Sequence, residues 1–151
     1  MRCAICILIT LLFAAGCDRR SSVSEVVRSF GASLSPDGTK QLVVTRREKS
    51  LVDFEVFNST SSEQLVSDSI GSDAMRWFLY WETSSKLWGY GSDIGYFKIF
   101  EFTAGGAVTQ IEVGRSLPVP AEVWENLPSS LQPKYKKQNK SEQATPRKPS
   151  D

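Results

Sequence analysis

The sequence predicts an all-β fold, in which a small antiparallel meander forms one sheet or a sandwich and is followed by a short helix and a disordered tail. Between residues 26 and 113, short runs of β-branched and aromatic residues are divided by Gly, Asp, Asn and Ser. The connections between these runs are short, which favours antiparallel neighbours. Along Leu51–Asn58, apolar residues alternate with Asp53 and Glu55, as expected of a strand with one buried face.

The N-terminal sixteen residues have the pattern of an export signal. Arg2 precedes an apolar run, and the small residues Ala14, Ala15 and Gly16 stand before Cys17. The apolar run is too short for a membrane span, because twelve helical residues cover about 18 Å and the hydrocarbon core is about 30 Å thick. We therefore predict a signal peptide over residues 1–16. Both a lipid-anchored and a plainly secreted product remain open at this point.

The residues Ala14-Ala15-Gly16-Cys17 resemble the lipobox of bacterial lipoproteins, although Leu is commoner where Ala14 stands. The resemblance implies that Cys17 is acylated and anchors the chain to a membrane, with residues 17–24 as a lipidated tether. Because Cys3 and Cys6 lie within the predicted signal, Cys17 has no partner for an internal disulfide in the mature chain. Asp18 resembles the inner-membrane retention signal of enterobacterial lipoproteins, which favours the periplasmic face of that membrane and leaves the outer membrane as the alternative.

The composition excludes several classes of function. Residues 17–133 carry eleven basic and fifteen acidic side chains, which argues against a broad nucleic-acid surface. The chain has no histidine, so it lacks imidazole bases and the usual zinc ligands. We predict neither a cofactor nor a metal.

Eight strands are expected before residue 114. They are Val26–Leu34, Gln41–Arg46, Leu51–Asn58, Glu63–Ser69, Met75–Glu82, Lys86–Gly91, Gly95–Thr103 and Ala107–Val113. The strand over Met75–Glu82 is apolar on both faces, which places it centrally in a sheet or beneath a second layer. Ser35-Pro36-Asp37-Gly38 is a turn sequence, with proline at the second position and glycine at the fourth.

The C-terminal third changes character after the last strand. Pro118 and Pro120 end the sheet, and residues 120–127 predict one or two helical turns with Trp124 as the anchor onto the sheet. We expect a single β domain over residues 25–133. Residues 134–151 hold six basic and two acidic side chains and few apolar ones, and this composition predicts a disordered basic tail.

The stretch from Leu34 to Val44, with Ser35-Pro36-Asp37-Gly38 at its start, resembles the beginning of a WD40-like (TolB-type) β-propeller blade. A weaker likeness follows between Trp81 and Phe102, without the Ser-Pro-Asp-Gly turn. Eight strands supply only two blades, and a closed propeller needs about four or more. The resemblance therefore implies a blade-like meander and mildly favours a protein-binding role.

Carboxylates and turn residues supply the candidates for chemistry. Asp53 and Glu55 lie about 7 Å apart on one strand face, and with Glu82 or Asp93 they are the candidate acid and base of an enzyme acting on glycans. The alternative is a solvated outer face. Asp68, Ser69, Ser72 and Asp73 offer oxygens for calcium but do not match an EF-hand loop. Gly89–Gly95 does not match a phosphate-loop spacing and predicts a hairpin.

Aromatic residues crowd the strands between residues 75 and 103 and are the strongest functional signal. They serve either as core or as a partly exposed face that binds a protein or stacks on sugar rings. The candidate binding face consists of Trp77, Tyr80, Trp81, Trp88, Tyr90 and Tyr96.

Together these features predict a non-enzymatic envelope lipoprotein that binds a protein partner in a membrane-associated assembly. A glycan-acting enzyme and a carbohydrate-binding module are the alternatives. Dimerisation through an edge strand remains open, because a two-blade fragment leaves its sheet edges free.

Overall fold

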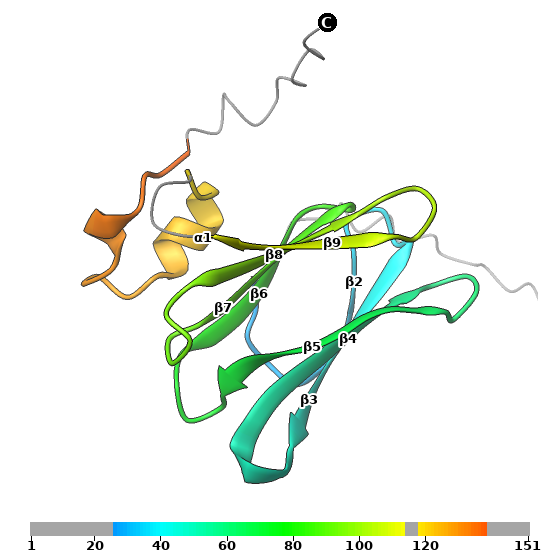
Figure 1. Ribbon diagram of the computed structural model, residues 1–151, viewed down its shortest axis with the longest axis horizontal. Helices are drawn as coiled ribbons and strands as arrows, with labels where there is room; N and C mark the ends of the chain where they lie inside the picture. The colour runs from blue at the N-terminus through cyan, green and yellow to red at the C-terminus, as the bar shows by residue number, and fades with distance from the viewer. Residues whose placement is uncertain (1–25, 114–117, 139–151) are drawn as a thin grey trace, which may run out of the picture.

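The computed structural model describes residues 26–113 and 118–138. The predicted signal peptide, Cys17, the tether and residues 139–151 of the predicted tail lie outside the described residues. Within them the all-β prediction is confirmed: nine strands form two antiparallel sheets, and one short helix follows (Figure 1).

Each sheet contains a meander of four consecutive strands. The four-stranded sheet has the order β2 (Gly31–Leu34), β3 (Lys40–Arg47), β4 (Leu51–Asn58) and β5 (Gln64–Ser72). The five-stranded sheet has the order β1 (Val26–Val27), β6 (Trp77–Thr83), β7 (Lys86–Gly91), β8 (Phe97–Phe102) and β9 (Val108–Val113). A 3₁₀ turn, Glu48–Ser50, links β3 to β4.

The β2–β3 turn is held by the hydrogen bonds that its sequence predicts. The Gly38 N–H donates to the Ser35 carbonyl at 2.8 Å, and Gly38 has a φ of 73°, which favours glycine. One carboxylate oxygen of Asp37 accepts from the Thr39 N–H at 2.9 Å, the Thr39 hydroxyl at 2.8 Å and the Ser35 hydroxyl at 2.8 Å. Burial raises the pKa of Asp37, but these hydrogen bonds outweigh burial, so its pKa lies well below the ordinary value.

This lowered pKa predicts a pH-dependent contribution to stability. Because the folded state favours the Asp37 carboxylate, the contribution is present above the ordinary aspartate pKa of about 3.9 and is lost as the pH falls below it. We expect wild type to be more stable than Asp37→Asn at neutral pH, with the difference shrinking in acid. Urea midpoints measured along a pH series check this, and a difference that is the same at every pH would contradict it.

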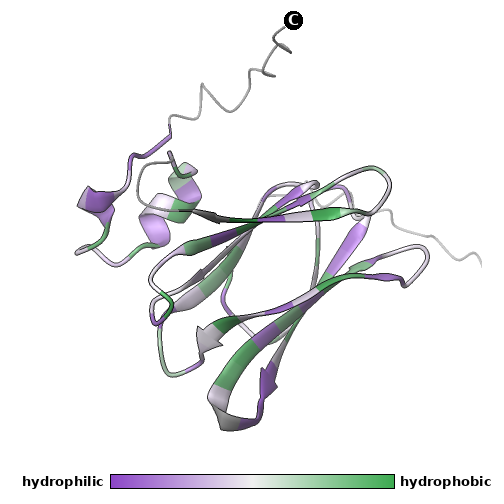
Figure 2. Cartoon of the chain, viewed as in Figure 1, coloured by the Kyte–Doolittle hydropathy of each residue, from purple (hydrophilic) through white to green (hydrophobic). Residues whose placement is uncertain are grey.

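The two sheets pack face to face around an inter-sheet cluster (Figure 1). Alternate residues of β3 and β4, such as Val44 and Phe54, point inward from the four-stranded sheet, so hydrophobic and polar residues alternate along the ribbon (Figure 2). The facing residues come from β6, β7 and β8. The rings of Phe54 and Phe100 meet edge to face across the interface, with centroids 5.2 Å apart.

A second cluster fills the opposite face of the five-stranded sheet. Here a C-terminal segment, residues 118–138, lies over the rings of β6, β7 and β8 and makes a third layer. The segment contains α1 (Ala121–Asn126) and a 3₁₀ turn, Gln132–Lys134. The expectation that Met75–Glu82 is central or lies beneath a second layer is therefore confirmed, because β6 is buried on both faces.

Trp124, the expected anchor of the helix, is half-buried and packs against this second cluster beside Val123, which is fully buried. The predicted tail boundary at residue 134 needs correction, because it is too early. Tyr135 is buried, and its ring packs edge to face against Phe97. A parallel bridge also joins Lys137 to Val119.

The first predicted strand, Val26–Leu34, is in fact two strands that belong to different sheets. β1 pairs with β6, whereas β2 pairs with β3. The chain crosses between the sheets at residues 28–30, and Gly31 follows with a φ of 126°, a backbone conformation that glycine adopts most readily. This crossing segment places Phe30 at the surface.

Candidate functional site

The candidate binding face of the sequence analysis is largely part of the core. Trp77, Tyr80, Trp81, Trp88 and Tyr90 are each at most 8% exposed. Trp77 and Trp81 belong to the inter-sheet cluster, and the other three lie beneath the C-terminal segment. Tyr96 is half-buried. The rings therefore do not form one exposed strip on the described residues, because both faces of β6, β7 and β8 are covered.

Tyr90 shows how complete this cover is. Its side chain is 1% exposed, and its ring stacks on Phe78 with centroids 5.1 Å apart. Its hydroxyl finds no hydrogen-bond partner among the described residues. Burial raises the pKa of Tyr90 above the ordinary tyrosine value, because the charged form is poorly solvated there.

Removing this hydroxyl should therefore not destabilise the fold. A buried polar group without a partner carries its desolvation cost uncompensated, so Tyr90→Phe should be as stable as wild type or more stable. Urea unfolding of the two chains checks this. A clear loss of stability in Tyr90→Phe would show that the hydroxyl is hydrogen-bonded in solution.

The candidate catalytic carboxylates do not gather into one site. Asp53 lies on the outer side of β4 and forms an ion pair with Arg47 at 3.0 Å. Glu82 accepts from the Trp88 indole N–H at 2.7 Å, and Asp93 accepts from the Ser72 N–H at 2.8 Å, so each has a structural partner. Glu82 lies within β6 near the hairpin end of the β6–β7 pairing, whereas Asp93 lies beyond the opposite end. Glu55 is half-buried on the face of Asp53.

The candidate calcium ligands are likewise divided between ion pairs. Lys98 of β8 donates to both carboxylate oxygens of Asp68 at 2.8 and 2.9 Å and to the Ser69 carbonyl at 2.9 Å. Asp73 pairs instead with Arg46 at 2.7 Å. The contact between Lys98 and Asp68 joins the two sheets, so Asp68 has a structural role in the sandwich. Among the described residues no group of three or more His, Cys, Asp or Glu is placed to hold a metal.

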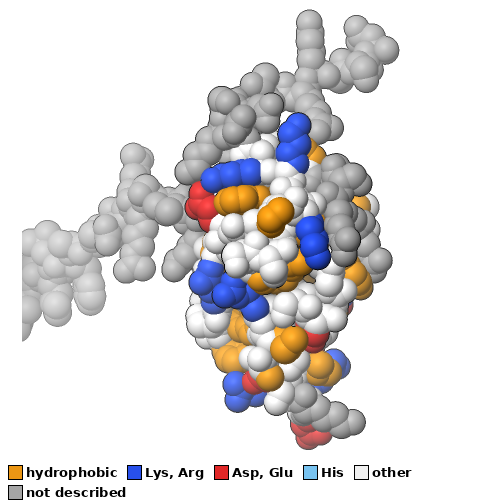
Figure 3. All heavy atoms as spheres, turned by 90° about the vertical axis from the view of Figure 1, so that its left-hand side faces the viewer, with side chains coloured by type: hydrophobic (Ala, Val, Ile, Leu, Met, Phe, Trp, Pro, Cys, Tyr) orange, Lys and Arg blue, Asp and Glu red, His pale blue; other side chains and the backbone are white. Residues whose placement is uncertain are grey.

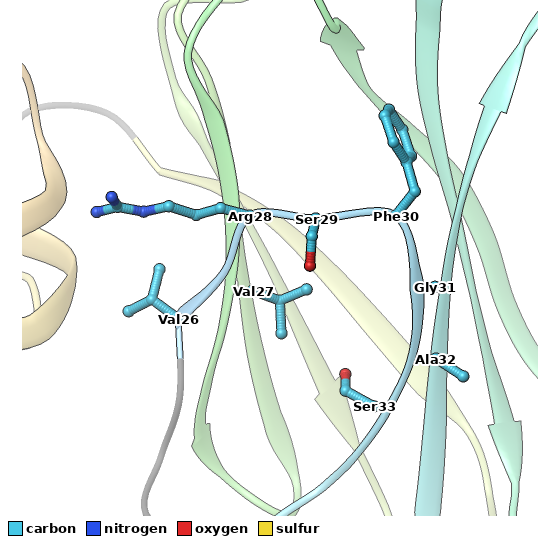
Figure 4. Close-up of a pocket in the computed structure, with 8 residues that line it drawn as sticks. All are labelled: Val26, Val27, Arg28, Ser29, Phe30, Gly31, Ala32 and Ser33. Carbon is cyan, nitrogen blue, oxygen red and sulfur yellow. The ribbon is translucent and has the colours of Figure 1, made fainter.

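The crossing segment borders a hollow of about 200 Å³ lined by residues 26–33. Figure 4 shows Val27, Ser29 and Ser33 within the bend of the segment, while Arg28 and Phe30 point away from it in different directions. The Ser33 hydroxyl is buried and finds no partner among the described residues. The hollow is thus shaped by backbone and small side chains, with an aromatic and a cationic side chain beside it.

Phe30 is the centre of the most distinctive exposed surface. It remains 40% exposed although its ring contacts Trp77, with centroids 5.6 Å apart. The Arg46 guanidinium lies 5.0 Å from the Phe30 ring centroid and also pairs with Asp73. Met75, which lies between Asp73 and Trp77 in the chain, is 48% exposed. We call Phe30, Arg46, Asp73 and Met75 the Phe30 surface.

Three of the four residues of the Phe30 surface are of types that are enriched at protein interfaces. Phe, Met and Arg are enriched at protein interfaces, and an arginine held over an aromatic ring presents a flat, partly ordered surface. Lys and Arg side chains with hydrophobic ones between them are also visible at the end of the molecule that carries α1 (Figure 3). Phe30 was not among the predicted site residues, because residues 26–34 have the pattern of one continuous strand.

Comparison of the chain with protein-family models, with curated proteins and with solved structures gave no match. In the described part of the chain, no helix has the length and apolar character that crossing a membrane requires.

Proposed function

We propose that this chain is a lipid-anchored protein of the bacterial envelope with a non-enzymatic role, and that the Phe30 surface binds a protein partner. The observation that carries the proposal is the partly exposed Phe30 ring beneath the Arg46 guanidinium. Aromatic and arginine side chains supply much of the binding energy at protein interfaces. The buried rings of β6–β8 support the fold, so the binding role falls to this surface.

The position of the surface in the chain supports a partner at the membrane. Only residues 18–25 separate Cys17 from β1, and an extended chain covers at most about 3.6 Å per residue. An anchor at Cys17 would hold β1 within roughly 30 Å of the bilayer surface. Phe30 follows β1 directly, so its partner would belong to a membrane-associated assembly.

The anchor is tested by replacing Cys17 with alanine in a bacterial host. We expect wild type to incorporate labelled palmitate and to sediment with membranes, and Cys17→Ala to do neither. Cys6→Ala is the matched control, because it lies in the segment that would be removed and should behave as wild type. Equal processing and release of all three chains would contradict the anchor.

The binding surface is tested by placing a photo-reactive amino acid at Phe30 and, separately, at Gln41 in the bacterium that encodes the chain. Gln41 is exposed on β3, so it controls for chance encounters. We expect a discrete cross-linked product at Phe30 that weakens when Arg46 is replaced by alanine. The same products at both positions would contradict the proposal.

A further inference from the structure

The four edges of the two sheets differ in how well they are protected against pairing with another strand. β1 has two residues, and β2 has four. β5 is longer, but its pairing with β4 contains two register shifts, which distort an edge. β9 has six residues and pairs with β8 without interruption. Neither proline nor lysine occurs in it, so it lacks two common protections of an edge.

The middle of β9 is also exposed on both faces of its sheet. Gln110 lies opposite Phe100 and so shares the face that meets the four-stranded sheet, yet Gln110 is exposed. Ile111 lies opposite Ile99 on the face that the C-terminal segment covers, yet Ile111 is 37% exposed. The inter-sheet cluster reaches β9 at Val108, which lies opposite Phe102 next to the hairpin, but neither layer covers Gln110 or Ile111.

The backbone polarity of β9 follows from its hairpin. The Thr103 N–H donates to the Ala107 carbonyl at 2.9 Å, so this pair is a hydrogen-bonded one. Such pairs alternate along an antiparallel ladder. The backbone groups of Thr109, Ile111 and Val113 therefore point to β8, and those of Val108, Gln110 and Glu112 point away from the sheet.

We propose that β9 pairs antiparallel with β9 of a second copy of this chain, centred on Gln110. In this register Gln110 faces its own counterpart, and Val108 faces Glu112 of the other copy. All three outward residues of each strand are then hydrogen-bonded, whereas a centre on Ile111 would engage only two. Ile111 packs against Thr109 of the other copy, which reduces its exposure.

The sequence of β9 is compatible with antiparallel pairing to an identical strand. No two like charges face each other, and the two-fold axis keeps each residue on its own face of the sheet. The pairing joins two five-stranded sheets into one continuous sheet and leaves no free β9 edge. It uses a different part of the molecule from the Phe30 surface and does not depend on the proposed function.

The first test is the mass of the full chain in mild detergent, measured by light scattering. We expect a dimer for wild type. Gln110→Lys places two ammonium groups opposite each other and should weaken association by about tenfold or more. Gln110→Thr, a neutral strand former at the same exposed site, should remain dimeric. A monomeric wild type, or an unchanged Gln110→Lys dimer, would overturn the proposal.

The second test identifies the register by disulfide trapping. In the full chain with its three natural cysteines replaced by alanine, Thr109→Cys and Ile111→Cys chains carrying different tags are mixed and oxidised. The two residues face each other at a non-hydrogen-bonded pair, where the Cα atoms are about 4.5 Å apart. We expect the mixed product to predominate over either self-linked product. Equal yields, or a predominance of either self-linked product, would overturn the register.

Discussion

Tyr135→Ala should destabilise the protein by about 3 kcal/mol, the range found when large aromatic side chains are removed from cores. Tyr135 lies within the predicted tail, yet it is 7% exposed and its ring meets Phe97 with centroids 5.1 Å apart. Its loss leaves a void between the C-terminal segment and β8. Chemical unfolding followed by tryptophan fluorescence measures the change.

Two variants make this result specific. Tyr135→Phe keeps the ring and should lose little stability, whereas Lys134→Ala removes an exposed neighbour and should be nearly neutral. If Tyr135→Ala were as stable as Lys134→Ala, the C-terminal segment would not cover the sheet in solution.

Gly91→Ala should have a comparable effect, about 3 kcal/mol, because Gly91 of β7 lies directly against the backbone of Ile70 in β5 of the other sheet. A Cβ at Gly91 would overlap the carbonyl oxygen of Ile70 in β5. That atom belongs to the backbone and cannot be moved by a change of rotamer. Either the sheets separate or the strand shifts, and both disrupt the inter-sheet cluster.

Gly105→Ala is the matched control for this substitution. Gly105 lies in the β8–β9 turn, and its added Cβ would have only the Thr103 hydroxyl within 4 Å, at 3.9 Å. We expect its unfolding midpoint to stay close to that of wild type. Equal midpoints for Gly91→Ala and Gly105→Ala would show that β5 and β7 do not approach as closely as described.

Strand positions were predictable because period-two alternation and turn residues act locally. The predicted bounds of Leu51–Asn58 and Lys86–Gly91 are those of β4 and β7. The apolar character of both faces of Met75–Glu82 indicated a covering layer, and the structure has one on each side of β6. The local sequence pattern therefore predicted the positions of most strands in the two sheets.

Two features were not predictable from local pattern. Residues 26–34 have the composition of one strand. They divide into β1 and β2 because the first part pairs with β6 of one sheet and the second part pairs with β3 of the other. The helical turns over residues 120–127 were predicted, but Tyr135 stands between Lys134 and Lys136, in a stretch with the composition of a tail. Tyr135 is buried because a ring-lined face of β6–β8 is available to receive it.

For the candidate site too, local pattern predicted which residues are present, but not which of them are exposed. The sequence showed that the strands over residues 75–103 are rich in rings, but exposure depends on which segments pack over them. The rings are buried, and the surface instead carries Phe30 because the chain must cross between the sheets at that point. A prediction that treats each strand separately does not find a residue exposed by such a crossing.

The central claim is that the ring-rich strands form core and that the Phe30 surface is exposed and available for binding. Hydroxyl-radical footprinting with mass spectrometry of the full chain tests it most directly. Phe30 and Met75 should be modified readily, while Trp88 and Tyr90 are protected, although indole is intrinsically more reactive than the Phe ring. Modification of Trp88 and Tyr90 at rates matching or exceeding that of Phe30 would contradict the account and return the binding role to the strands.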